Sequence, residues 1–134
     1  MSTGVVTLAP HDPDWAALAR SETARMEAAL GAGLLTVHHI GSTSIPGLRA
    51  KPIVDLLPVL KDMEALDGAR DAMEALGYKW LGENGLPGRR YCVFNDPVDG
   101  HRLVHAHLYA DGSSEVTRHL AFRDLLRKRS DLRR

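Results

Sequence analysis

Only one cysteine, Cys92, occurs in the chain, so no internal disulfide can form, which fits a reducing compartment. No apolar run approaches the roughly 18 residues that a membrane-spanning helix needs. The N-terminus also has no basic region followed by an apolar stretch, which a signal peptide would require. These absences predict a cytoplasmic protein with no membrane span.

An excess of charge of either sign is also missing. The chain has 17 basic and 17 acidic residues, which gives a formal net charge of zero at pH 7. The composition therefore builds no field that attracts nucleic acid or an anionic membrane, and we expect neither partner. With 134 residues, 44% of them hydrophobic, the chain is predicted to form one domain with a buried core.

Apolar spacing and turn residues predict a mixture of helices and strands. Helices are expected over 13–30 and 62–77, and from Ser113 or Ser114 onward. Strands are expected over 5–8, 35–40, 53–60, 78–81, 90–94 and 103–110, the last two as an antiparallel pair. Because the two kinds of element do not alternate strictly, the pattern favours an α+β domain with a mixed sheet. Pro58 lacks an amide donor, so we expect the strand 53–60 to pair mainly before it.

A loop rich in hydroxyl groups follows the strand 35–40. It consists of Gly41, Ser42, Thr43 and Ser44, and Lys51 lies shortly after it. Hydroxyls beside a flexible glycine and a cation suit an anion such as phosphate. The alternative is a turn in which the hydroxyls bind nearby backbone groups. The loop lacks the glycine-lysine-serine/threonine ending of a P-loop.

Asp55 is a single carboxylate in an otherwise apolar strand. A buried charge is costly unless a partner compensates it, so this residue needs an explanation. One is a buried salt bridge with Lys51, Arg89 or Arg90. The other is a functional carboxylate that holds a divalent cation such as Mg²⁺, which prefers oxygen ligands.

Two histidines lie on one face of the strand 103–110. His105 and His107 are two residues apart, so their side chains project in the same direction and can share a metal ion or a phosphate. Imidazole ligands favour a softer ion such as Zn²⁺. The alternative is a pair of partly exposed histidines without a ligand.

The last predicted helix carries cationic residues at a spacing of four. His119, Arg123 and Arg127 therefore lie along one ridge. This ridge is either a solvated charged face or a cationic wall beside an anionic ligand.

Several motifs together resemble the GrpB family. The stretch HIGSTSIPGLRAKPIVDLL from His39 resembles the family signature, and 11–15, 85–90, 105–107 and 119–127 supply further matches. The resemblance covers nearly the whole chain. It implies a nucleotidyltransferase-like fold over 1–134, ending before the further helical segment that relatives usually carry.

The resemblance also implies a departure from nucleotidyltransferase chemistry. The superfamily pattern places Gly-Ser before an acid, a hydrophobic residue and a second acid; Gly41, Ser42 and Asp55 match, but Leu57 stands where the second acid belongs. Two-metal transfer ordinarily needs more than one carboxylate. His105 and His107 lie on a later strand, where the superfamily often has its third acid. Asp55 with these two histidines is therefore the predicted catalytic and metal-binding set.

The leading hypothesis is an enzyme of nucleotidyltransferase type that acts on a nucleotide-like or phosphorylated small molecule. Asp55, His105 and His107 would bind Mg²⁺ or Zn²⁺ or act as acid/base groups. The predicted ligand-binding residues are Gly41, Ser42, Thr43, Ser44, Lys51, Arg90, His119 and Arg123. The alternatives are a non-catalytic nucleotide-binding module and, third, a metal-dependent hydrolase. The sequence leaves the oligomeric state open.

Overall fold

The structure is a computed structural model that describes residues 7–132, and side chains through residue 129. Its helices are α1 (Asp14–Leu30), α2 (Met63–Gly68), α3 (Arg70–Ala75) and α4 (Ser114–Leu132). Its strands are β1 (Leu34–Ile40), β2 (Val54–Leu60), β3 (Lys79–Trp80), β4 (Arg90–Asn95) and β5 (Arg102–Ala110). Short 3₁₀ turns, η1 (Gly31–Gly33) and η2 (Ser42–Ser44), flank β1. Within 7–132 no helix is long and apolar enough to cross a membrane.

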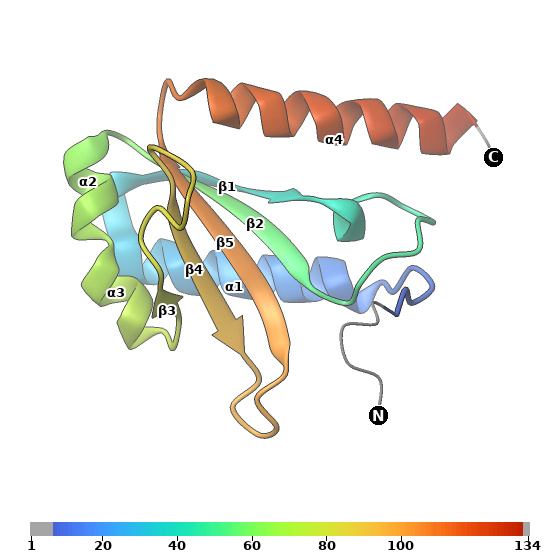
Figure 1. Ribbon diagram of the computed structural model, residues 1–134, viewed down its shortest axis with the longest axis horizontal. Coiled ribbons are helices and arrows are strands. Elements are labelled where there is room, and N and C mark those ends of the chain that lie inside the picture. Colours follow the sequence, from blue (N-terminus) through green and yellow to red (C-terminus); the bar gives the residue numbers. More distant parts are fainter. Residues whose placement is uncertain (1–6, 133–134) are drawn as a thin grey trace.

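The five strands form one mixed sheet in the order β1-β2-β5-β4-β3 (Figure 1). Only β2 and β5 are parallel among these neighbours, and the other pairs are antiparallel. The predicted α+β class with a mixed sheet is therefore confirmed. The parallel pair lies in the middle of the sheet and brings together segments about 50 residues apart in sequence.

The two faces of the sheet are covered unequally. The main core lies on the face that α1 covers, behind the sheet in Figure 1, and includes Met26, Leu56 and Ala106. On the opposite face α4 covers a small second cluster through Val116 and Leu120. The members of that cluster are Ile40, Leu57, Val59 and Tyr109. The rest of this face, which we call the open face, carries partly exposed polar side chains from β2, β4 and β5.

Two local predictions need correction. The helix expected over 62–77 is divided into α2 and α3, because Gly68 is a poor helix former in the middle of the segment. Its start is as predicted, since Asp62 Oδ1 accepts the Ala65 amide at 2.8 Å. The strand β2 pairs beyond Pro58 on both sides, contrary to expectation. Its register with β5 omits Leu57 and Pro58 and then resumes, so the missing amide is tolerated.

Half of the N-terminal strand expected over 5–8 lies outside the described residues, and the other half, Thr7 and Leu8, does not form a strand. Beyond it, Ala9 forms an isolated antiparallel bridge with Ala50.

Glu22, which the sequence did not single out, is a buried structural acid on α1. Its Oε1 accepts hydrogen bonds from Tyr78 Oη and Arg25 Nη1, both at 2.8 Å. Burial and the neighbouring carboxylate raise the pKa of Tyr78, which keeps the phenol protonated as a donor. Glu22 is therefore a buried carboxylate whose burial is compensated by its hydrogen-bond partners.

Candidate functional site

The register of β2 and β5 places Asp55 directly beside His105. Asp55 Oδ1 lies 3.5 Å from His105 Nδ1 and 3.1 Å from His107 Nε2. The two imidazoles project from the same face of β5, as their alternation predicts. The three side chains are 15–28% exposed, so they lie at the floor of the open face rather than in the core. The predicted convergence of these residues from two separate segments is present.

Each imidazole meets an arginine on the side away from Asp55. Arg102 Nη1 lies 3.1 Å from His105 Nε2, and Arg89 Nη1 lies 3.4 Å from His107 Nδ1. Arg89 is 8% exposed and its guanidinium stacks on the Tyr91 ring at 4.6 Å. From the sequence, Arg89 was only a salt-bridge candidate for Asp55, and neither Arg102 nor Tyr91 stood out.

The glycine at the start of the hydroxyl loop touches the carboxylate. Gly41 has φ +72°, and a Cβ built on it would lie 2.6 Å from Asp55 Oδ2. This backbone needs glycine for its conformation and for its close approach. Gly41 therefore brings the loop against the site.

Two of the three loop hydroxyls are engaged within the loop region. Ser44 Oγ donates to the Gly41 carbonyl at 2.6 Å, and Thr43 Oγ1 lies 2.9 Å from His39 Nε2. Thr43 and Ser44 are both buried, whereas Ser42 is exposed. The turn interpretation therefore accounts for Ser44 and Thr43, and Ser42 keeps its hydroxyl exposed to solvent.

A cavity of about 430 Å³ opens between this loop and the open face. Its lining residues are Leu8, Ser42, Thr43, Leu48, Arg49, Ala50, Lys51, Ile53, Asp55 and His105. Two cations, Arg49 and Lys51, share the cavity with the Asp55 carboxylate. Arg49 was missed by sequence reasoning because nothing in its local spacing separates it from an ordinary surface arginine.

The remaining predicted ligand residues do not gather at this cavity. Arg90 is turned away and pairs with Asp67 at 2.8 Å. Arg123 bonds Asp124 at 2.9 Å and the carbonyl of His39 at 3.4 Å, which ties α4 to β1.

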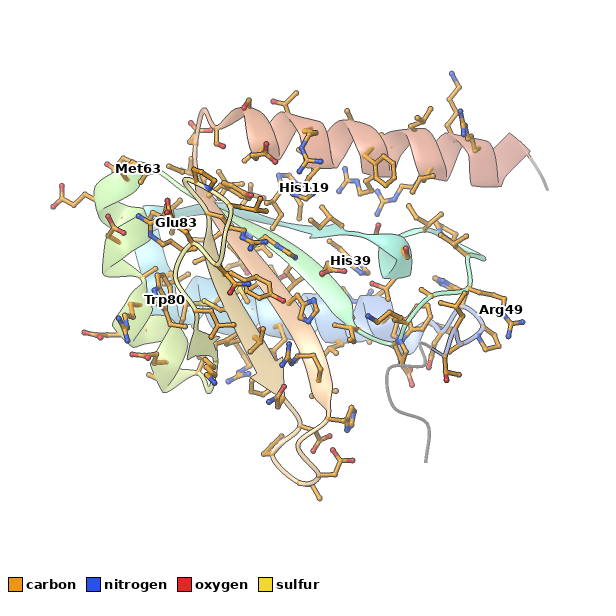
Figure 2. The ribbon with its side chains drawn as sticks, viewed as in Figure 1. His39, Arg49, Met63, Trp80, Glu83 and His119 are labelled. Atoms are coloured by element: carbon orange, nitrogen blue, oxygen red, sulfur yellow. The ribbon has the colours of Figure 1, made fainter. Side chains whose placement is uncertain are left out.

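His119 faces the sheet from α4 (Figure 2), with its ring centroid 6.0 Å from that of His107. Burial, followed by Arg118, lowers the pKa of His119, so its ring is neutral at neutral pH. It therefore borders the open face without adding positive charge there.

Asp55 stays ionised despite its environment. Burial by itself raises the pKa of a carboxyl group, but the hydrogen bonds with His105 and His107 outweigh it and lower the pKa of Asp55 to about 2. A carboxylate held in this form is suited to bind cations and is a poor proton acceptor near neutral pH.

This pKa predicts acid sensitivity. A depressed folded-state pKa stabilises the fold above the ordinary value of 3.8, and that contribution is lost as pH falls through about 2. The gap corresponds to about 2 kcal/mol at most, because the carboxylate is partly exposed. Urea unfolding of wild type and Asp55→Asn across this range should show the difference shrinking with acid. A difference that does not change with pH would contradict the assignment.

A divalent cation is the cofactor that the fold family implies, and three side chains of the site carry atoms that could bind one. Ligand atoms of Asp55, His105 and His107 all lie within 4.8 Å of one another. Among the described residues no hydrogen bond uses Asp55 Oδ2. Mg²⁺ is commonly held by one or two carboxylates together with substrate phosphates. Asp55 lines the cavity and keeps Oδ2 free of hydrogen bonds to the described residues, so its carboxylate fits that role.

The architecture matches that of a solved polymerase. The structure of Cid1 in complex with its short product ApU superposes with a TM-score of 0.63 at 10% identity, over 92% of this chain and 38% of that one. At this identity the likeness concerns the fold alone. The fold is nucleotidyltransferase-like, as the motifs predicted.

Sequence comparison identifies the family, which the likeness of fold to Cid1 does not. The model of the family described as GrpB protein matches residues 5–134, and the chain belongs to the GrpB family. The crystal structure of the conserved protein GrpB from Enterococcus faecalis superposes with a TM-score of 0.82 at 39% identity, covering 91% of this chain and 73% of that one.

Among curated relatives, the UPF0157 protein YqkA of Bacillus subtilis is 40% identical over 117 residues, which cover 87% of this chain and 33% of YqkA. The chain spans between 33% and 63% of the length of the first three such relatives.

Proposed function

We propose that this domain is an enzyme of nucleotidyltransferase type that acts on a phosphorylated, nucleotide-like small molecule. The observation that carries the proposal is a carboxylate with one unused oxygen at the edge of a cavity that also holds two cations and a hydroxyl. Unlike Glu22, whose partners are all structural, Asp55 keeps Oδ2 available. The likeness of the fold to that of Cid1, whose structure holds the short product ApU, supports the same class of substrate.

The residues divide into two roles. Lys51, Arg49 and Ser42 bind phosphate oxygens by charge-assisted and ordinary hydrogen bonds. Asp55 Oδ2 and the substrate phosphates together hold a divalent cation, which when bound neutralises charge on the phosphates. The apolar lining from Leu48 and Ile53 excludes water from the other side of the ligand.

A non-catalytic binding module is the second candidate, and Leu57 favours it. This residue occupies the place of the second acid and is fully buried in the cluster under α4, where a carboxylate would be desolvated. A site with one carboxylate lacks the ligands for a second metal ion. Substrate turnover separates the two candidates: binding without product across nucleotides and acceptors favours the module, and metal-dependent release of phosphate favours a hydrolase.

Lys51 provides a test of the binding mode. Isothermal titration with ATP, with and without Mg²⁺, should show Mg²⁺-dependent binding that Lys51→Met weakens about tenfold, the value of one lost charge-assisted hydrogen bond. Lys61→Met removes a charge beside a different cavity and should leave the affinity unchanged. Equal affinity for wild type and Lys51→Met would contradict the placement of the phosphates.

A further inference from the structure

The two histidines beside Asp55 have an arginine at the nitrogen that faces away from the carboxylate. The distances are 3.1 Å from Arg102 Nη1 to His105 Nε2 and 3.4 Å from Arg89 Nη1 to His107 Nδ1. The inner nitrogens, His105 Nδ1 and His107 Nε2, face Asp55 Oδ1. The five side chains thus form a chain of contacts from one arginine to the other, centred on one carboxylate oxygen.

Both arginines are themselves held in place. Arg89 donates to the carbonyl oxygens of Glu83 at 3.2 Å and Asn84 at 3.0 Å, and it stacks on Tyr91. Arg102 donates through Nε to Asn95 Oδ1 at 2.7 Å. Arg89 is therefore fixed by several contacts in a buried position, whereas the exposed Arg102 is oriented by its single bond to Asn95.

Hydrogen-bond chemistry then fixes the protons. A guanidinium carries donors and no acceptor, so the imidazole nitrogen that it meets must offer a lone pair. In a neutral imidazole the other nitrogen carries the proton. This places the proton of His105 on Nδ1 and that of His107 on Nε2, and both N–H groups then point at Asp55 Oδ1.

We propose that Arg102 and Arg89 are positioning residues that lock His105 and His107 in opposite tautomers, so that both donate to Asp55. In this state the two histidines are not metal ligands. A ligating imidazole needs a lone pair on the inner nitrogen and an acceptor facing its outer N–H, and here a donor faces that position instead. The pair orients Asp55 and leaves Oδ2 as its cation-binding atom.

This inference concerns the same site as the proposed function and assigns the histidines a different role from the one that their spacing predicted. It does not require any activity, since the tautomers are a property of the protein without metal or substrate. If the protein does not bind nucleotides, the tautomer assignment is unaffected. If the tautomer assignment is wrong, the proposed nucleotide binding is unaffected.

The direct test is a long-range ¹H–¹⁵N correlation spectrum of the imidazole rings in the metal-free protein at neutral pH. We expect His105 to be protonated at Nδ1 alone and His107 at Nε2 alone. The result for His105 is discriminating, because a free histidine in water favours the Nε2 proton. Finding His105 protonated at Nε2, or either ring doubly protonated, would overturn the proposal.

Zinc binding provides a second readout. Arg102→Met frees His105 Nε2 to carry the proton and should raise Zn²⁺ affinity at least about tenfold in a chelator competition, the scale of outer-shell effects. Lys51→Met also removes a positive charge near Asp55, but Lys51 contacts neither imidazole. This variant should therefore raise Zn²⁺ affinity less and leave the His105 tautomer unchanged. Equal gains, or no gain with Arg102→Met, would overturn the proposal.

Discussion

Replacing Asp55 with asparagine is expected to remove the Mg²⁺-dependent part of nucleotide binding, a loss of about a hundredfold in affinity at saturating Mg²⁺. Asparagine keeps the size of the side chain but has no negative charge to bind a cation. Among the described residues that line the cavity, Asp55 is the only acid, so no neighbouring carboxylate can replace it. Titration calorimetry with ATP, with and without Mg²⁺, measures the Mg²⁺-dependent and the Mg²⁺-independent affinity.

A surface acid provides the control for this variant. Asp67 pairs with Arg90 away from the cavity and its side chain is 62% exposed, so Asp67→Asn should bind Mg²⁺-ATP as wild type does. Circular dichroism of both variants at neutral pH confirms the fold. An Asp55→Asn protein that is folded and binds ATP with the wild-type dependence on Mg²⁺ would remove the centre of the proposed site.

Gly41→Ala is expected to have the largest effect on stability, about 3 kcal/mol or more. The new Cβ would lie 2.6 Å from Asp55 Oδ2 and 3.1 Å from Asp55 Cβ, so either the loop or the carboxylate must move. The backbone at φ +72° and ψ −176° adds strain of about 1–3 kcal/mol for any residue with a side chain. Urea unfolding monitored by circular dichroism measures the loss.

Gly47 separates the two contributions to that loss. It also has a positive φ, +77°, but a Cβ there would meet nothing within 4 Å. Gly47→Ala should therefore cost only the backbone strain, about 1–2 kcal/mol, and retain ATP binding. If both variants lost equal stability, the close approach of Gly41 to Asp55 would not be what requires glycine at that position.

The part of the site that follows from local rules could be predicted from sequence. Alternation along β5 puts His105 and His107 on one face, and an acid in an apolar strand marks Asp55 as unusual. The motif match then indicated that these segments meet. What the sequence could not provide is the register of β4 and β5, which determines the neighbours of each histidine.

Arg89 and Arg90 illustrate this limit. Adjacent residues at the start of a strand point to opposite sides, so a choice between them depends on a shift of one position. Arg90 was the residue predicted to contact the ligand, whereas in the structure Arg89 contacts His107 and Arg90 pairs with Asp67. The same holds for the hydroxyl loop, where only tertiary contacts show that Ser44 and Thr43 are used internally.

The fold class was predictable because element types depend on periodicity, which is local. The strand order was not, since the parallel pairing of β2 with β5 is a contact between distant segments. Leu57 was noted in sequence as a missing acid. Its burial beneath α4 adds the physical reason why a carboxylate is disfavoured there.

The most direct measurement is a crystal structure of this domain with a non-hydrolysable nucleoside triphosphate and Mg²⁺. We predict phosphate oxygens on Lys51 and Ser42, a cation on Asp55 Oδ2, and both imidazoles still contacting Oδ1. A triphosphate bound away from this cavity, or a cation coordinated by the nitrogens of His105 and His107, would contradict the account.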